Sequence, residues 1–529
     1  MLTSLLAAGA AFAGAALADV DPVIAYGSKF FYKTNGTQFF IKGVAYQEPS
    51  SSSTDFIDPL ADIDSCKRDI PYLTAIQTNT IRVYGVDANS SHADCVNAFA
   101  DADIYLIIDL GSPTDSINRD DPSWDVSLYE RYTSVIDNFA NYTNVIGFFA
   151  GNEVSNTVNT TQASAFVKAA VRDSKAYIKE KGYNKSVGYA AADVTDIRYQ
   201  LADYMNCNSE DESVDFFGDN VYEWCGDSSF TESGYNKIAS NFANYSVPYF
   251  FAEYGCNTVN PRTFTNIPTM YGSEMSYMLN GGIVYEYFND DNDYGLVTLS
   301  GSSISTLTDY SAFSTEIPSA TPTGTSRSDY TISNTALQAC PSVDSNWEAS
   351  SVLPPTPDSE LCACMVASLT CVVSDSVSSD GISDLFDYLY GLDDTAYTSG
   401  ISTNATSGKY GAYSMCSSKD QLSWALNAYY EAQSAAGNSD SACSFSGSAS
   451  TQSATTSGSS CSTKLAAVGT AGTGTVSGSA ATATGTAGST STSGSGAYSN
   501  APSAVFVGSW QLGAYIFAAV LSGGAMLVL

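Results

Sequence analysis

Val145-Ile146-Gly147-Phe148-Phe149-Ala150-Gly151-Asn152-Glu153 is a nearly continuous apolar run that ends in an amide and a carboxylate. A second run, Pro248-Tyr249-Phe250-Phe251-Ala252-Glu253-Tyr254-Gly255, places another glutamate near its end. Runs of this kind are typical of strands that are buried on both faces of a parallel sheet. Because a carboxylate beside a buried strand is costly to desolvate, these two glutamates are candidates for a functional site.

Further apolar runs lie between residues 19 and 315, separated by helix-like segments such as Leu128–Phe139. With the two above, they are Ile41–Tyr46, Thr80–Tyr84, Ile104–Leu110, Val145–Glu153, Val187–Asp193, Asp215–Tyr222, Pro248–Gly255 and Gly282–Phe288. Strand–helix units that repeat in this way over about 250 residues predict an α/β fold, a (β/α)8 TIM barrel. A doubly wound open sheet is the structural alternative, but no Gly-x-Gly-x-x-Gly turn follows an early strand.

In such a barrel the chemistry lies at the carboxyl ends of the strands. Glu153 ends the fourth run, and Glu253 lies near the end of the seventh. Four polar or aromatic residues also lie at or near strand ends: Asn152, Tyr84, Tyr222 and Tyr285. Two carboxylates that face one pocket can break a glycosidic bond. The alternative is that each glutamate forms a structural ion pair.

The composition narrows the possible ligands. The chain has 55 Asp and Glu against 21 Lys and Arg, which argues against a nucleic-acid partner. Its 35 tyrosines include candidates for flat surfaces on which sugar rings stack. A zinc site needs a closed set of Cys and His ligands, and His92 is the one histidine, so no metal site is expected, and no cofactor is expected either. His92 itself is expected to lie on the surface. The calcium-like stretch 289–295 lacks a closing glutamate and is expected to be a solvated loop or a substrate rim.

The ends of the chain predict export to the cell surface. Residues 1–18 have the apolar core and the small-x-small cleavage site of a signal peptide. Residues 501–529 form an apolar end that follows small residues, with no basic flank, which favours a GPI-attachment signal over a membrane span. In an exported protein the 12 cysteines are expected to form disulfides, although each group of six allows about 15 pairings.

Composition also divides the chain between its ends. Residues 19–315 are the predicted catalytic barrel, and residues 316–358 are a connector partly pinned to it through Cys340. Residues 359–462 are expected to form a small, mainly helical, disulfide-rich domain with a helix over Lys419–Glu431. Residues 463–500 are rich in Ser, Thr and Gly, and the region from 446 onward is expected to be an extended stalk.

Several motifs resemble those of fungal β-1,3-glucanosyltransferases of glycoside hydrolase family 72. They are Phe148-Phe149-Ala150-Gly151-Asn152-Glu153, Tyr222-Glu223-Trp224-Cys225-Gly226, Phe251-Ala252-Glu253-Tyr254-Gly255-Cys256-Asn257 and Ser112-Pro113-Thr114-Asp115-Ser116-Ile117-Asn118-Arg119. The resemblance covers residues 19 to about 345. The small domain resembles the cysteine-rich glucan-binding module of family 43, although that module often has one more cysteine pair.

The resemblance implies a retaining enzyme in which Glu153 is the general acid/base and Glu253 the nucleophile. It also implies a set of substrate-binding residues: Gln47, Tyr84, Ser112, Asn118, Arg119, Asn152, Asp193, Arg198, Tyr222 and Tyr285. The implied disulfides are Cys66–Cys95, Cys207–Cys340, Cys225–Cys256, Cys362–Cys416, Cys364–Cys461 and Cys371–Cys443.

The implied activity is internal cleavage of a β-1,3-glucan and transfer of the new reducing end to the non-reducing end of another glucan. The expected partners are the donor and acceptor glucans and a membrane, to which a GPI lipid attaches the protein. The enzyme is expected to be a monomer that lies on the outer face of the plasma membrane and in the cell wall. Two alternatives remain open, an endo-β-1,3-glucanase and a non-catalytic wall-binding protein.

Overall fold

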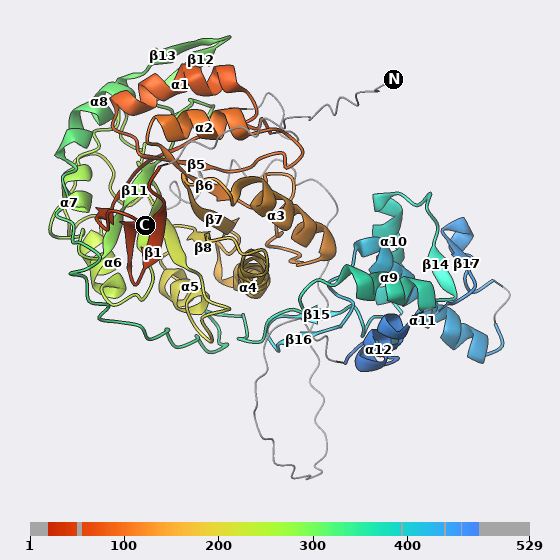
Figure 1. Ribbon diagram of the computed structural model, residues 1–529. Coiled ribbons are helices and arrows are strands. Elements are labelled where there is room, and N and C mark those ends of the chain that lie inside the picture. The colour runs from red at the N-terminus through yellow and green to blue at the C-terminus, as the bar shows by residue number, and fades with distance from the viewer. Residues whose placement is uncertain (1–19, 50–55, 393–394, 439–440, 456–457, 475–529) are drawn as a thin grey trace, which may run out of the picture.

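The computed structural model describes residues 20–49, 56–392, 395–438, 441–455 and 458–474. A closed barrel of parallel strands forms the larger part, which confirms the predicted (β/α)8 fold (Figure 1). Consecutive strands are neighbours, and β11 closes onto β4. The barrel strands are β4 (Ile41–Ala45), β5 (Thr80–Val83), β6 (Tyr105–Asp109), β7 (Val145–Asn152), β8 (Ser186–Ala191), β9 (Phe216–Val221), β10 (Tyr249–Tyr254) and β11 (Leu279–Val284).

One helix follows each barrel strand. These helices are α1 (Ile63–Ala75), α2 (Ala93–Asp101), α3 (Val126–Phe139), α4 (Ser164–Glu180), α5 (Arg198–Met205), α6 (Tyr235–Phe242), α7 (Ile267–Tyr271) and α8 (Thr308–Glu316). Helix α3 illustrates why they form. The side chain of Asp125 caps its first turn by accepting from two backbone N–H groups, and Tyr132, Val135, Ile136 and Phe139 recur at helical spacing on the buried face.

A short antiparallel sheet closes the end of the barrel at which the strands begin. It consists of β1 (Val23–Tyr26), β2 (Lys29–Tyr32) and β3 (Gln38–Phe39). The ring of Phe30 contacts those of Phe216 and Phe250, which lie at the start of β9 and β10. The interior is therefore filled at this end, and the opposite end carries the side chains described below.

Seven of the eight predicted strands agree with the structure to within two residues at each end. The eighth is shifted, because β11 runs over Leu279–Val284 and not over Gly282–Phe288. The predicted run began at Gly282 and therefore left out Leu279, Asn280 and Gly281. In the structure the Asn280 amide nitrogen donates to the carbonyl oxygens of Ser28 and Tyr249 at 3.0 and 3.1 Å, which provides hydrogen-bond partners for a buried donor. Past Val284 the chain pairs with the segment from Tyr294 onward, where β12 (Val297–Ser300) and β13 (Ser303–Thr306) form a hairpin.

The expected connector packs along the barrel. The Cys207–Cys340 disulfide holds it to the segment that follows α5. Trp347 is fully buried, and its ring lies 5.1 Å from that of Tyr204. A short 3-10 turn, η2 (Ile317–Ser319), begins this segment.

The smaller domain contains α9 (Ser359–Ser368), β14 (Cys371–Val373), α10 (Ser379–Tyr390), α11 (Ser418–Ala435), β17 (Ala449–Thr451) and α12 (Ser459–Val468), with the short strands β15 (Thr403–Asn404) and β16 (Lys409–Tyr410) beside the barrel (Figure 1). Single turns are η1 (Val158–Ala163) in the barrel and η3 (Thr395–Tyr397) and η4 (Phe445–Gly447) here. All 12 cysteines are paired, in the six pairs that the resemblance implies.

The small domain contacts the barrel directly. The backbone N–H of Val126, at the start of α3, donates to the carbonyl oxygen of Met415 at 2.9 Å. The Tyr410 ring lies 5.9 Å from that of Phe166 on α4. These contacts place the small domain against the α3–α4 side of the barrel (Figure 1).

The expectation of an unfolded stalk from residue 446 is wrong for the described residues up to 474. Strand β17 pairs with β14, and α12 extends to Val468, which packs into the core of the small domain. Two disulfides, Cys371–Cys443 and Cys364–Cys461, hold this Ser- and Thr-rich segment in place. Composition alone therefore underestimates how much of it folds.

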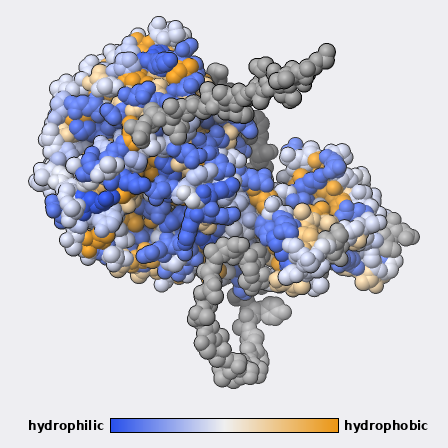
Figure 2. Space-filling model, in the orientation of Figure 1, coloured by the Kyte–Doolittle hydropathy of each residue, from blue (hydrophilic) through white to orange (hydrophobic). Residues whose placement is uncertain are grey.

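The predicted signal peptide, most of the stalk and the apolar C-terminal segment lie outside the described residues. Within the part that the structure describes, no helix is long and apolar enough to cross a membrane. The visible face of the barrel is covered mostly by hydrophilic residues (Figure 2).

Candidate active site

The two glutamates lie at the same end of the barrel. Glu153 directly follows β7, and Glu253 is the fifth residue of β10. The register between β9 and β10 pairs Glu253 with Asn220, and the Asn220 amide donates to Oε1 of Glu153 at 2.6 Å. A residue beside one carboxylate therefore hydrogen-bonds to the other.

Three donors surround the Glu253 carboxylate, which is only 5% exposed. Oε1 accepts from the Tyr84 hydroxyl at 2.9 Å and from Arg82 Nη1 at 3.2 Å. Oε2 accepts from the Tyr222 hydroxyl at 2.7 Å. Because all three groups donate, they fix the orientation of an ionised carboxylate and stabilise its charge.

Glu153 is held mainly through its backbone. Its φ of +50° lies in the left-handed region, which is uncommon for a residue other than glycine. Its N–H donates to the carbonyl oxygen of Ala190 at 2.8 Å, and its own carbonyl oxygen accepts from Arg119 Nη2 at 2.8 Å. Such conformations persist only where neighbours hold them, as happens at functional sites.

Arg82 joins the two halves of the site. Its fully buried guanidinium pairs with Asp109 through Nε and Nη2, at 3.2 and 2.9 Å, and with Glu253 through Nη1. Nη2 also donates to the side-chain oxygen of Asn152 at 2.8 Å. A continuous network therefore runs from Glu253 through Arg82, Asn152 and Asn220 to Glu153.

Burial raises the pKa of both glutamates, and it raises that of Glu253 to about 7. The nearby charge of Glu153 adds to the rise at Glu253, whereas Arg82, Tyr222 and Tyr84 lower the pKa of Glu253. At Glu153 the Asn220 amide and the Arg119 charge act in the same lowering direction. Three donors act directly on the Glu253 carboxylate and one on that of Glu153, so the ionised form of Glu253 has the larger number of hydrogen bonds to stabilise it.

A second charged group supports the wall of the site. Arg198 pairs with Asp193, with Asp219 at 3.2 Å and with Glu223 at 3.0 Å. Asp193 Oδ2 in turn accepts from the backbone N–H of Tyr222 at 2.7 Å. Asp193 and Arg198 were predicted to contact sugar, and this stays a prediction. In the structure Asp193 holds the backbone of Tyr222, whose hydroxyl binds Glu253, and Arg198 pairs with Asp193.

The remaining predicted binding residues are Tyr285, Gln47, Ser112 and Asn118, which follow three different barrel strands. The Tyr285 ring, directly after β11, contacts Tyr84 and Tyr222 at centroid distances of 6.3 and 6.5 Å. Gln47 lies two residues after β4 and is half-buried. Ser112 and Asn118 accept local hydrogen bonds within the loop that follows β6, from the backbone N–H groups of Asp115 and Asp120.

Arg82 and Asn220 are the site residues that the sequence reasoning missed. Both lie inside predicted strands, Thr80–Tyr84 and Asp215–Tyr222. A charged or amide side chain within a buried strand costs free energy unless it is paired, so its presence there was a usable signal.

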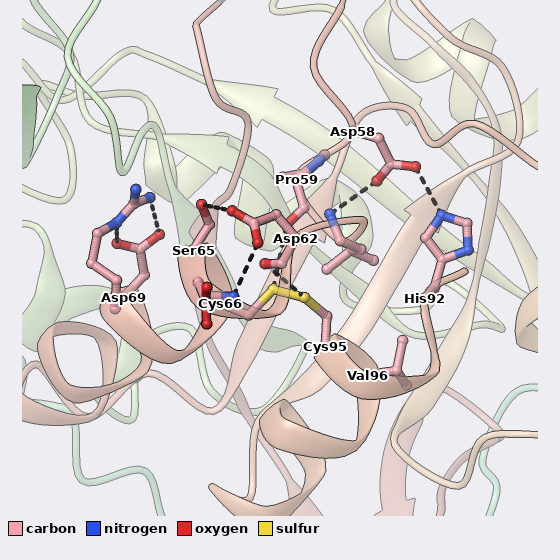
Figure 3. Close-up of a disulfide and its surroundings, with 12 residues drawn as sticks. Asp58, Pro59, Asp62, Ser65, Cys66, Asp69, His92, Cys95 and Val96 are labelled. Atoms are coloured by element: carbon pink, nitrogen blue, oxygen red, sulfur yellow. Dashed lines mark hydrogen bonds and ion pairs between the residues drawn. A yellow bond between two sulfur atoms is a disulfide. The ribbon is translucent and has the colours of Figure 1, made fainter. Parts of the chain in front are cut away.

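His92 was expected on the surface, and this prediction is wrong. It is 3% exposed, and its Nε2 lies 2.8 Å from Oδ2 of Asp58. Figure 3 shows this pair beside the Cys66–Cys95 disulfide, which joins α1 to α2. The partner is 34 residues earlier in the chain, so only the fold brings the two together. In the described residues no group of three or more His, Cys, Asp or Glu side chains could hold a metal ion.

Comparison with known proteins agrees with this geometry. Residues 12–321, more than half of the chain, match the model of glycoside hydrolase family 72, described as glucanosyltransferase, and residues 369–450 match the X8 domain model. The chain is 49% identical over 549 residues to a 1,3-beta-glucanosyltransferase of Arthroderma benhamiae, covering 100% of this chain and 99% of that protein. It is 44% identical over 482 residues to 1,3-beta-glucanosyltransferase gas1 of Schizosaccharomyces pombe, covering 90% and 86% of the two chains.

Solved structures give the same answer. That of Saccharomyces cerevisiae Gas2p in complex with laminaritetraose and laminaripentaose has a TM-score of 0.74 and 38% identity, and the match covers 81% of this chain and 94% of that one. The chain belongs to the glucanosyltransferases of glycoside hydrolase family 72.

Proposed function

We propose that the chain is a retaining β-1,3-glucanosyltransferase in which Glu253 is the nucleophile and Glu153 the general acid/base. The observation that carries these roles is the network that connects both carboxylates through Arg82, Asn152 and Asn220 at one end of the barrel. Relatives of this chain bear the name 1,3-beta-glucanosyltransferase, and a solved relative holds laminari-oligosaccharides.

In the first step Glu253 attacks the anomeric carbon of the donor glucan. The bond to the glycosidic oxygen breaks, and Glu153 gives its proton to that oxygen, so that one fragment leaves as an alcohol. Glu253 suits the nucleophilic role because its three donors orient and stabilise the ionised form. Glu153 suits the acid role because burial raises its pKa and the charge of Glu253 lies nearby.

In the second step Glu153, now ionised, takes a proton from the incoming hydroxyl, whose oxygen replaces Glu253 at the anomeric carbon. A 3-hydroxyl at the non-reducing end of another glucan gives a new β-1,3 bond and a longer chain. Water would give hydrolysis. We assign Asn152 to the sugar hydroxyl next to the reacting carbon, and Gln47, Tyr84, Tyr222 and Tyr285 to the walls of the cleft.

Three further predicted residues, Ser112, Asn118 and Arg119, belong to the loop after β6. Arg119 acts by holding the Glu153 carbonyl oxygen. The hydrogen bonds of Ser112 and Asn118 are local to their loop, and we assign both residues to sugar units farther from the reacting bond. Asp193 and Arg198 remain proposed sugar contacts, and Asp193 also holds the backbone N–H of Tyr222.

The test is incubation with a reduced β-1,3-linked oligoglucoside, followed by mass analysis of the products. Transfer is expected to produce oligosaccharides longer than the starting one, whereas a hydrolase would produce only shorter ones. Glu153→Gln and Glu253→Gln are each expected to remove nearly all turnover while glucan binding persists. Undiminished transfer by both variants would reject the assignment.

We further propose that the small domain is a family 43 glucan-binding module. On this domain Tyr388 and Tyr390 are 45% and 54% exposed. The ring of Tyr429 contacts those of Tyr388, Tyr397 and Phe445 at centroid distances of 5.5 to 6.2 Å. Exposed aromatic rings of this kind can stack on pyranose rings. The test is to measure how much of the Tyr388→Ala variant binds to insoluble β-1,3-glucan. We expect less of this variant to bind than of the unmodified protein.

Export and anchoring complete the proposal. The signal-like residues 1–18 and the small-residue and apolar segments around 501–529 support an enzyme on the outer face of the plasma membrane, attached by a GPI lipid, and in the cell wall. We propose that it acts there as a monomer. Release of the protein from cells by a phospholipase specific for GPI anchors would test this localisation.

A further inference from the structure

Arg262 is a buried cation that the proposed chemistry does not use. It lies between β10 and α7 and is 2% exposed. Asp309 on α8 accepts from its Nε at 2.6 Å and from its backbone N–H at 3.2 Å. Because one carboxylate accepts hydrogen bonds from both the backbone and the side chain of Arg262, the two terminal nitrogens of the guanidinium have a fixed orientation.

Those two nitrogens donate to three backbone carbonyl groups. Nη1 contacts the carbonyl oxygens of Gly255, at 3.2 Å, and Tyr285, and Nη2 contacts that of Tyr294. Gly255 directly follows β10, Tyr285 directly follows β11, and Tyr294 belongs to the loop 289–295. Arg262 therefore joins the ends of two barrel strands to this loop.

The local sequence allows this arrangement only with glycine at position 255. Its φ is +121°, a conformation that other residues rarely adopt. A Cβ atom at that position would also lie 2.9 Å from Nη1 of Arg262. The glycine two residues after Glu253 thus leaves space for the guanidinium.

The backbone that Arg262 contacts carries the rings of Tyr285 and Tyr294, which together with Tyr222 form an aromatic wall. The ring of Tyr294 lies 5.4 Å from that of Tyr285 and 5.7 Å from that of Tyr222. The hydroxyl of Tyr222 donates to Glu253. The carboxylates themselves have separate supports, in Arg82 and Asn220.

We propose that Arg262 is a positioning residue that fixes the aromatic wall on which glucan rings rest. This inference rests on the proposed function of the same site. Rigid aromatic surfaces hold a sugar ring equally well before and during the reaction. An interaction that is equal in the ground state and the transition state changes KM and leaves kcat nearly unchanged.

The test compares three variants in steady-state kinetics with a β-1,3-linked oligoglucoside as donor. Arg262→Lys keeps the charge but cannot reach three carbonyl groups in a fixed plane. Asp309→Asn weakens the grip on Arg262 and leaves the guanidinium in place. Arg172→Lys is the matched control, because Arg172 also pairs with one carboxylate, that of Asp173, and donates to one backbone carbonyl, that of Pro354, away from the aromatic wall.

We expect Arg262→Lys to raise KM about tenfold, with less than a threefold fall in kcat per folded molecule. Asp309→Asn should change KM in the same direction by a smaller factor, and Arg172→Lys should leave KM unchanged. Thermal midpoints and active-site titration give the folded fraction of each variant.

A merely structural role would lower the active fraction, and hence the apparent kcat, with KM unchanged. That result for Arg262→Lys, or an equal rise in KM for Arg172→Lys, would overturn the inference. If the wild-type enzyme yields only oligosaccharides shorter than the starting one, the proposed transfer is contradicted. The KM values measured for the cleavage reaction would then still decide the role of Arg262.

Discussion

The Tyr222 hydroxyl offers a direct test of how the site holds its negative charge. It donates to Oε2 of Glu253 at 2.7 Å, and this hydrogen bond lowers the pKa of that carboxyl group. Tyr222→Phe removes the donor and keeps the ring. The ionised form of Glu253 then loses stabilisation, so its pKa rises. Since Glu253 must be ionised to attack, the acidic limb of the pH profile of kcat/KM should move to higher pH.

The size of the change follows from the contacts. A hydrogen bond to a charged group contributes about 1.5 to 3 kcal/mol, and about 1.4 kcal/mol corresponds to one pH unit in a pKa. Arg82 and Tyr84 still donate to the other oxygen, and water can partly replace the lost hydroxyl. We therefore expect the lower part of this range, a displacement of about one pH unit, and about tenfold less activity on the acidic limb.

The assay is kcat/KM from initial rates of oligosaccharide transfer across the pH range in which the variant stays folded. Tyr294→Phe is the matched control, because its ring contacts Tyr222 and Tyr285 but the structure gives it no hydrogen bond to Glu253. An unmoved acidic limb in Tyr222→Phe would refute the reasoning. So would an equal displacement in Tyr294→Phe.

Three further predictions concern stability. Burial raises the pKa of Glu286 to about 8. Between the unfolded value near 4.5 and about 8, the folded state holds a proton that the unfolded state has lost, so the free energy of unfolding falls as the pH rises. In denaturant titrations, the free energy of unfolding of Glu286→Gln relative to that of the wild type should be at least about 1 kcal/mol higher at pH 8 than at pH 5, and an equal difference at both pH values would contradict this. Arg82→Met leaves Asp109 buried without its cation and should cost about 3 to 5 kcal/mol of unfolding free energy, whereas a loss below about 1 kcal/mol would show that the pair is dispensable. Removing the Cys207–Cys340 disulfide, which spans 133 residues, should cost about 5 kcal/mol by the loop-entropy relation, and an unchanged unfolding midpoint of the double Ser variant would exclude that contribution.

Most of the barrel could be predicted because its strands are buried on both faces and therefore appear as continuous apolar runs. The prediction failed where polar residues are satisfied inside the fold. Asn280 lay outside the predicted strand, yet in the structure it is part of β11, and carbonyl oxygens of Ser28 and Tyr249 accept hydrogen bonds from its side-chain amide. Those partners are far away in sequence, so no local pattern reveals them.

The positions of Glu153 and Glu253 followed from one geometric rule, since the carboxyl ends of barrel strands meet. The supports of these residues did not follow from it. Asn220 bonds to a glutamate that lies 67 residues away, and Arg82 bonds to one that lies 171 residues away. His92 failed for the same reason, because Asp58 reaches it only in the folded chain.

The small domain shows a different limit. Its last segment is so rich in Ser, Thr and Gly that composition predicts no fold. The structure includes it through disulfides and through the apolar contact of Val468. The pairing of cysteines could not be deduced from their spacing, and it came only from the resemblance to a family.

The most direct measurement is to trap the enzyme with a 2-fluoro β-1,3-linked donor that carries a good leaving group, and to map the modified peptide by mass spectrometry. The proposed roles predict one glycosyl group bound to Glu253, with none in Glu253→Gln. A label on Glu153, or steady turnover without any covalent adduct, would contradict the assignment of nucleophile and acid/base.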